Sequence, residues 1–104
     1  MSGIDLIKAE RERQISAEGW TPEHDDAHEF GELAAAASCY IKSGLNIDLR
    51  QHAPASWPFE ASWWKPGMWE QNLVKAGALI AAEIDRLQRL QRLQQQEKEQ
   101  PCDS

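Results

Sequence analysis

The sequence predicts an all-α fold: a small three-helix bundle closed by a Trp/Pro-rich loop, with a C-terminal helix extension. Two observations support this. Apolar residues recur at helical spacing in three segments, and glycine follows the first two. Between the second and third segments lies WPFEASWWKPGMW, which holds four of the five tryptophans and is interrupted by prolines. Because proline breaks a helix, this stretch is expected to be a packed loop.

The bulk properties indicate one domain. We expect a single helical domain over 1–95 and a disordered polar tail over 96–104. The net charge of -6 argues against general nucleic-acid binding and against binding to an anionic membrane. The longest apolar run, ALIAA, is far shorter than the ~20 residues of a membrane span. The N-terminus has no apolar signal region, and Cys39 and Cys102 form no disulfide or zinc pattern, so we expect a cytoplasmic protein.

The first two helices are bounded by local signals. The first is expected over 4–18, ending at Gly19. The second begins with Thr21 as N-cap and Pro22 in the first helical position, and is expected to run unbroken to Gly44. On a helical wheel its apolar face is formed by Phe30, Leu33, Ala34, Ala37, Tyr40 and Ile41.

The loop over 45–66 follows, with 46–50 as a short helical turn or strand, and the last helix begins near Gly67 or Met68 and runs to about residue 95. Its core face is predicted to be the stripe Leu73, Ala76, Gly77, Ile80, Ile84 and Leu87. Beyond it, leucines recur every third residue and drift around the helix. The extension therefore projects into solvent or packs on a second copy, and we expect a homo-oligomer.

The strongest polar cluster lies at the start of the second helix. On the wheel Asp25, His28 and Glu32 share one face opposite Phe30. This set is compatible with a solvated, acid-rich helix start, with a binding role or with a metal site.

Asp26 and Glu83 are expected to face inward, where they and Lys65 or Lys75 would form a polar pocket. The alternative is that Asp26 caps its own helix and Glu83 accepts a hydrogen bond from a tryptophan.

Two functional classes follow from these residues. Trp63 and Trp64 beside Lys65 can stack a base and pair with a phosphate, or can simply complete the core. A metal-dependent nucleotide hydrolase of the all-α pyrophosphohydrolase type would instead use Glu29, Glu32, Glu83 and Asp85 with Mg²⁺ or Mn²⁺. Glu29 and Glu32 have the E-x-x-E spacing of such enzymes, but the matching E-x-x-D is absent.

The segments ERERQISAEGWTPEHDD, HEFGELAAAASCY, WPFEASWWKP and LVKAGALIAAEIDRL together resemble a family of small phage- and prophage-encoded proteins of unassigned function. The resemblance covers residues 10–87, without 42–55, and implies a bacterial cytoplasmic setting and an accessory role in infection or lysogeny. The matching positions are Trp20, His24, Asp25, Asp26, His28, Glu32, Trp63, Trp64, Lys65, Pro66, Lys75, Glu83 and Asp85.

The preferred hypothesis is a non-enzymatic binding protein without a cofactor or catalytic residues. It would capture a nucleotide-like ligand or inhibit a host factor, for instance in counter-defence. An oligomeric interaction module and the hydrolase are the alternatives. The expected ligand-binding residues are Trp20, His24, Asp25, Asp26, His28, Trp63, Trp64, Lys65, Lys75 and Glu83.

Overall fold

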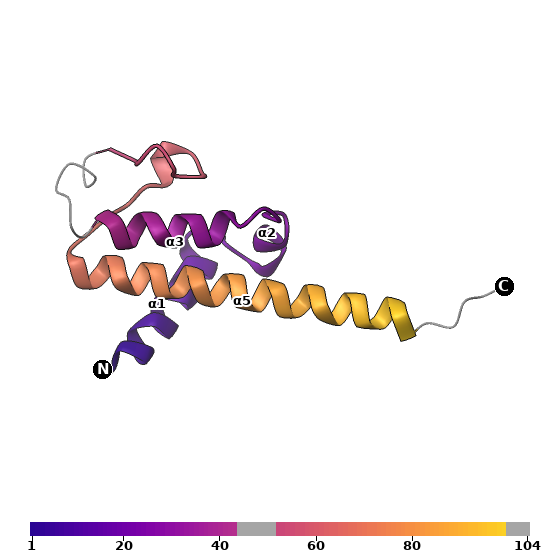
Figure 1. Ribbon diagram of the computed structural model, residues 1–104. Helices are drawn as coiled ribbons and strands as arrows, with labels where there is room; N and C mark the ends of the chain where they lie inside the picture. Colours follow the sequence, from indigo (N-terminus) through magenta and orange to yellow (C-terminus); the bar gives the residue numbers. More distant parts are fainter. Residues whose placement is uncertain (44–51, 100–104) are drawn as a thin grey trace.

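The computed structural model describes residues 1–43 and 52–99 (Figure 1). These residues form α1 (Gly3–Ala17), α2 (Pro22–Asp26), α3 (Glu32–Ser43), the 3-10 turn η1 (Ala61–Trp63) and α5 (Trp69–Glu99). Within these ranges the chain has no strand, which confirms the all-α class. The turn or strand expected at 46–50, the helix stop at Gly44 and residues 100–104 of the expected tail lie outside the described residues.

Local capping signals set the first helix boundaries, and those at Gly19 and Thr21 are the ones predicted. Ser2 and Asp5 form a capping box at the start of α1. At its end Gly19 has a φ of +75°, and the Trp20 amide donates to the Gln14 carbonyl across 3.0 Å. Thr21 caps α2 by accepting from the His24 amide. The chain thus turns sharply between α1 and α2.

The single helix expected over 21–44 is wrong. It is divided into α2 and α3 by the turn over 27–31, in which Gly31 has a φ of +79° that no right-handed helix can contain. The Glu32 carboxylate accepts from the Phe30 amide across 2.7 Å and holds this turn. The break rotates the two segments relative to each other, so Phe30 is 92% exposed and Asp25 is fully buried, the reverse of the wheel prediction.

The core forms where α3 lies between α5 and the Trp loop, which we define as residues 52–68 (Figure 1). The core residues are Trp20, Leu33, Ala36, Ala37, Cys39, Tyr40, Trp57, Trp64, Ala76, Leu79 and Ala82. Alanines on both α3 and α5 allow the two helices to pack closely. Cys39 is buried in this core as a free thiol.

The core face of α5 differs from the prediction. Its buried residues are Asn72, Ala76, Ala78, Leu79, Ala82 and Arg86. The larger apolar residues Leu73, Ile80, Ile84 and Leu87 are instead between 42% and 51% exposed. The small-residue face is turned toward α3, which leaves these four residues of the predicted stripe outside, whereas Ala76 is buried as predicted. None of the described helices is long and apolar enough to span a bilayer.

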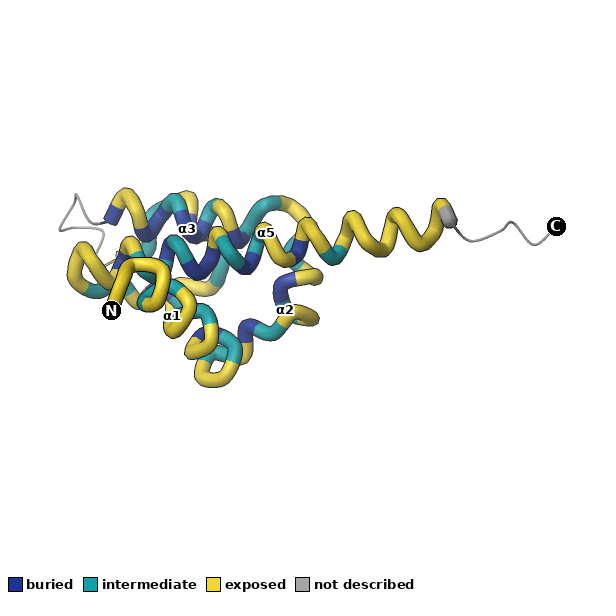
Figure 2. The backbone as a smooth tube through the Cα atoms, turned by 90° about the horizontal axis from the view of Figure 1, so that it is seen from below, coloured by how far each residue is buried: buried dark blue, intermediate teal, exposed yellow. Residues whose placement is uncertain are grey.

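The far half of α5 extends beyond the rest of the bundle (Figure 2). The helix reaches Glu99, past the expected end near residue 95, and residues 90–98 are exposed. Nearer its start, α1 crosses α5 at Gly77, where an added Cβ would lie 2.6 Å from Cδ1 of Ile7.

Candidate binding site

The Trp loop supplies rings to one continuous aromatic cluster. Trp64 stacks on Tyr40 with ring centroids 4.7 Å apart, and Trp57 contacts both rings edge-on. The Trp57 indole N–H donates to the Glu60 carbonyl across 2.9 Å. Trp64 is only 8% exposed, so it completes the core. The other alternative, in which its ring stacks on a ligand, does not hold for this tryptophan.

Trp63 lies at the edge of this cluster. It is half-buried, and its ring centroid lies 6.2 Å from that of Trp20 and 5.6 Å from that of Phe59. Trp20 in turn stacks on His24 at 6.1 Å with nearly parallel planes. The rings of Trp20 and Trp63 therefore separate two polar regions, a cleft on one side and a histidine pair on the other.

The cleft lies between α1 and the start of α5 and has a volume of about 490 Å³. Its lining residues are Leu6, Glu10, Arg13, Glu18, Lys65, Glu70, Gln71, Val74 and Lys75. At its inner end is a small hollow lined by Gln14, Trp20, Tyr40 and Trp63 together with several of the same charged residues. Four residues predicted for ligand binding, Trp20, Trp63, Lys65 and Lys75, thus meet in one place.

Ion pairs organise the charges of the cleft. Glu18 accepts from Arg13 and from Lys65, each across 3.1 Å, and Arg13 also pairs with Glu10 across 2.7 Å. The hydrogen bond from Arg13 lowers the pKa of Glu18, against an opposing effect of desolvation. Lys75 donates to the Lys65 carbonyl, and burial lowers the pKa of its ammonium group.

Tyr40 forms the inner wall beneath Lys75. Its hydroxyl accepts from the Lys65 amide across 3.3 Å, and Lys75 Nζ lies 5.7 Å from its ring centroid. Burial raises the pKa of the Tyr40 hydroxyl to about 12. Tyr40 therefore presents an uncharged aromatic ring at neutral pH, with the ammonium group of Lys75 above it.

Gln14 carries the most informative polar atom of the hollow. Its side chain is fully buried, and its Nε2 donates to Glu10 across 3.3 Å. Its Oε1 is the one buried side-chain oxygen or nitrogen of the described residues without a hydrogen-bond partner. An unpaired buried acceptor costs about 1–3 kcal/mol, so an N–H or O–H donor brought into the hollow would recover this energy.

The second polar region is a chain of hydrogen bonds around two histidines. Asp25 accepts from Arg11 across 2.6 Å and contacts His24 Nδ1 at 3.2 Å. The Nε2 atoms of His24 and His28 are 3.3 Å apart, and His28 Nδ1 lies 3.0 Å from Glu32. The predicted row of Asp25, His28 and Glu32 is therefore only partly correct. His28 and Glu32 meet, whereas Asp25 is buried against α1.

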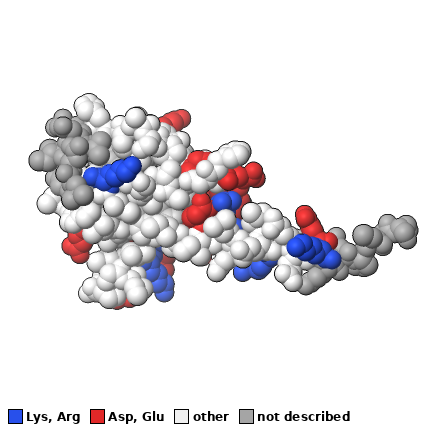
Figure 3. All heavy atoms as spheres, viewed as in Figure 1, with Lys and Arg blue, Asp and Glu red and all other residues white. Residues whose placement is uncertain are grey.

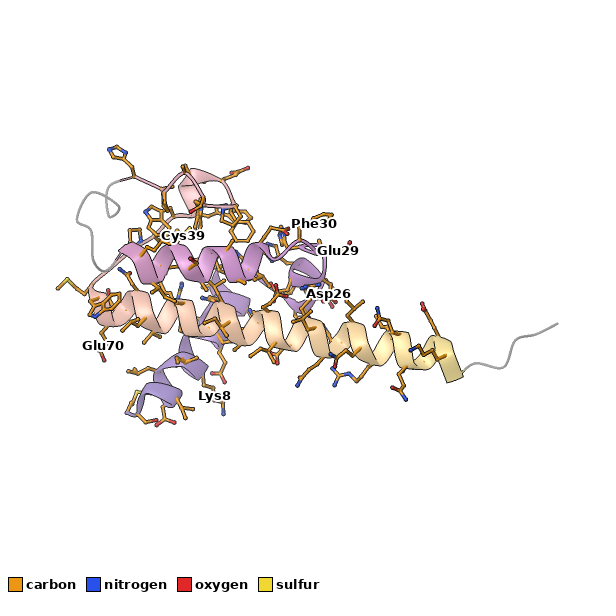
Figure 4. All side chains as sticks on the ribbon, viewed as in Figure 1. Lys8, Asp26, Glu29, Phe30, Cys39 and Glu70 are labelled. Atoms are coloured by element: carbon orange, nitrogen blue, oxygen red, sulfur yellow. The ribbon has the colours of Figure 1, made fainter. Side chains whose placement is uncertain are left out.

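Asp26 and Glu83 do not form the expected inward pocket with Lys65 or Lys75. Asp26 is exposed and pairs with Arg89 of α5 across 2.8 Å, because the break after α2 turns it toward that helix. Glu83 is half-buried and accepts from Arg86, one turn further along α5. Acidic side chains gather near this junction of α2 and α5 (Figures 3 and 4).

The acids of the hydrolase alternative are not brought together. Glu32 is engaged by His28 and Glu83 by Arg86, while Glu29 and Asp85 are exposed. In the described ranges no three His, Cys, Asp or Glu side chains converge as a metal cluster. Comparison of the chain with protein-family models, curated proteins and solved structures gave no match.

Sequence reasoning missed the residues that α1 contributes. Glu10, Arg13 and Gln14 line the cleft, and Arg11 reaches Asp25 across the turn between α1 and α2. One feature of the sequence could have indicated these residues: α1 has few apolar residues on the face that packs on the bundle. A helix that packs on a bundle with few apolar residues must bury polar ones instead.

Proposed function

We propose that the chain is a non-enzymatic binding protein whose cleft between α1 and α5 takes a nucleotide-like small molecule. The observation that supports this is the inner hollow. There Trp63, Lys65 and Lys75 surround the buried, unpartnered oxygen of Gln14. The volume of about 490 Å³ lies in the usual range of small-molecule sites. A phage-type accessory role in the bacterial cytoplasm, such as counter-defence, is the biological setting that the sequence resemblance suggests.

Each part of such a ligand has a matching group. A base can lie in the outer cleft, whereas the inner hollow holds only about 10 Å³ and admits no more than an N–H group or one water as the donor to Gln14 Oε1. A phosphate can pair with Lys65 and Arg13, both of which line the mouth of the cleft. Glu18 now accepts from these two cations, so a phosphate would have to displace its carboxylate. Glu18 is therefore an internal competitor of the ligand.

Calorimetric and tryptophan-fluorescence titration with nucleotides and cyclic dinucleotides, with and without Mg²⁺, tests this proposal. We expect saturable binding of one compound, binding about tenfold weaker in Lys65→Ala, and tighter binding in Glu18→Gln. Lys42→Ala, on the exposed surface of α3, is the matched control. The bound compound is then followed over time to separate capture from hydrolysis. A flat response across the panel, or equal affinity in Lys65→Ala and Lys42→Ala, overturns nucleotide capture.

A second candidate function, self-association through α5, is favoured by its exposed apolar stripe. Ile80, Ile84 and Leu87 recur at i, i+4 and i+7, the spacing of a helix-pairing seam. The first half of the helix carries Glu70, Lys75, Glu83 and Asp85, and the second half carries Arg86, Arg89, Arg92, Glu97, Lys98 and Glu99. Antiparallel pairing with a second copy would place the acidic half beside the basic half, although Glu83, Arg86 and Arg89 already form ion pairs within the chain.

Sedimentation equilibrium of the full chain tests this pairing. We expect a dimer that Ile84→Glu converts to a monomer, while Gln96→Glu, which makes the same charge change outside the stripe, leaves it intact. A monomeric wild-type chain at high concentration would exclude the pairing.

A further inference from the structure

His24 and His28 form an unusual pair between Trp20 and Phe59. Their Nε2 atoms are 3.3 Å apart, and their ring centroids are 4.6 Å apart with planes inclined at 61°. A linear N–H···N bond of this length would separate the ring centroids by about 5.5 Å, so the two rings do not meet head to head. Their side chains are 21% and 25% exposed, so the pair is accessible from solvent.

The other nitrogen of each ring faces a carboxylate. His24 Nδ1 lies 3.2 Å from Asp25, and His28 Nδ1 lies 3.0 Å from Glu32. Both carboxylates are themselves held in place, Asp25 by Arg11 and Glu32 by the Phe30 amide. Carboxylates in these positions favour hydrogen on each Nδ1, which leaves a lone pair on each Nε2. Two lone pairs at 3.3 Å repel each other unless a hydrogen on one Nε2 or a metal cation lies between them.

We propose that the Nε2 atoms of His24 and His28 bind one divalent transition-metal ion of the zinc type. Zinc–nitrogen bonds of about 2.0–2.1 Å at a tetrahedral angle separate two ligand nitrogens by about 3.3 Å, which is the separation between these two atoms. In such a chelate the two ring centroids would lie about 5.2 Å apart, against 4.6 Å here, so both rings must rotate for their lone pairs to point at one ion. A carboxylate on the second nitrogen is the usual support of a metal-binding histidine, and both rings have one.

The ligand set selects the class of metal. Imidazole suits Zn²⁺, Ni²⁺, Co²⁺ and Cu²⁺, whereas Mg²⁺ and Mn²⁺ prefer oxygen. Because the described residues offer no third side chain at this point, the remaining coordination positions are filled by water or by another small ligand. The site is separate from the cleft proposed for nucleotides, since Trp20 and Trp63 lie between them.

The neighbouring tryptophans provide a direct readout. The His24 ring centroid lies 6.1 Å from that of Trp20 and 6.0 Å from that of Trp63, so a paramagnetic ion bound there would quench indole fluorescence. Ni²⁺ is titrated into the full chain carrying Cys102→Ser, which removes the thiol near the C-terminus. Zn²⁺ is then added as a diamagnetic competitor.

We expect saturable quenching by one Ni²⁺ per chain, reversed by Zn²⁺. The affinity should fall at least tenfold in His24→Ala and in His28→Ala and stay unchanged in His52→Ala, the matched control that removes the remaining histidine. Glu32→Gln should weaken binding while leaving both nitrogen ligands in place. If either alanine variant fails to fold, ¹⁵N spectra of the wild-type histidines replace it, with a Zn²⁺-induced shift expected at both Nε2 atoms. Absence of saturable binding, or equal affinity in all three histidine variants, overturns the metal site and leaves a shared hydrogen between the rings.

Discussion

Arg11 of α1 donates to the fully buried carboxylate of Asp25 in α2 across 2.6 Å. The same guanidinium group donates to the Trp20 carbonyl across 3.1 Å. One side chain therefore fixes both the turn between α1 and α2 and the carboxylate that supports His24. This ion pair connects the stability of the N-terminal half to the geometry of the histidine pair.

Loss of Arg11 should destabilise the protein strongly. Arg11→Met would leave the Asp25 carboxylate buried without its cation, which typically costs about 3–5 kcal/mol. Urea unfolding monitored by circular dichroism measures this change. Arg92→Met removes the same charge from an exposed position of α5 and should change the free energy of unfolding by less than about 0.5 kcal/mol. Similar values for the two variants would show that the ion pair contributes little.

At the crossing of α1 over α5, a side chain at Gly77 should force the Ile7 side chain to shift. An alanine Cβ there would lie 2.6 Å from Cδ1 and 2.9 Å from Cγ1 of Ile7. Gly→Ala in a helix normally stabilises by about 1 kcal/mol, but this clash should reverse the sign and destabilise by about 1–3 kcal/mol. In an Ile7→Ala background the clash is removed, and Gly77→Ala should become stabilising. A double-mutant cycle of unfolding free energies measures the difference, and additive effects would contradict it.

The parts of the fold that the sequence predicted are those encoded by local residues. The Thr21 cap, Pro22 and Gly19 mark helix boundaries without reference to the rest of the chain. The break over 27–31 could not be predicted in this way, since the residues before Gly31 are compatible with a helix. The turn is held by the contact of Glu32 with the Phe30 amide and by docking of α2 on α5.

The predicted faces were only partly correct, for a related reason. Leu33, Ala37 and Tyr40 of α3 are buried as predicted, while Ala34 and Ile41 are exposed. Periodicity shows that α5 has an apolar stripe, but it cannot show which face another helix will cover. The alanine-rich α3 packs on the small residues around Ala76 and Ala82, so Ile80 and Ile84 remain outside. Within the candidate site, Trp63 and Lys65 were predicted together from their neighbouring positions in the sequence, whereas Lys75 was expected beside Asp26 and Glu83, and Gln14 enters only through the packing of α1.

Glu18 should contribute to acid sensitivity. Hydrogen bonds from Arg13 and Lys65 lower the pKa of its carboxyl in the folded state, despite desolvation, so the unfolded state binds more protons near its ordinary pKa of 4.5. The stabilisation is therefore present above pH 4.5 and is lost as the pH falls through the folded pKa. Denaturation midpoints measured from pH 7 to pH 3 should decline less steeply in Glu18→Gln than in wild type. Gln replacement at the exposed Glu12 is the control, and parallel curves for Glu18→Gln and wild type would refute the effect.

Tyr40 should make the protein sensitive to alkali. Burial raises the pKa of its hydroxyl from 10.0 to about 12, so between these values the folded state keeps a proton that the unfolded state has lost. Stability is therefore complete below pH 10 and falls as the pH rises from 10 to 12, by about 2–3 kcal/mol in total. Tyr40→Phe loses the hydrogen bond from the Lys65 amide but carries no titrating group, so it should start less stable and then decline less over this range. The test is to measure the free energy of unfolding of wild type and of Tyr40→Phe from pH 10 to pH 12. Equal slopes would mean that the Tyr40 hydroxyl ionises as readily in the folded protein as in the unfolded chain.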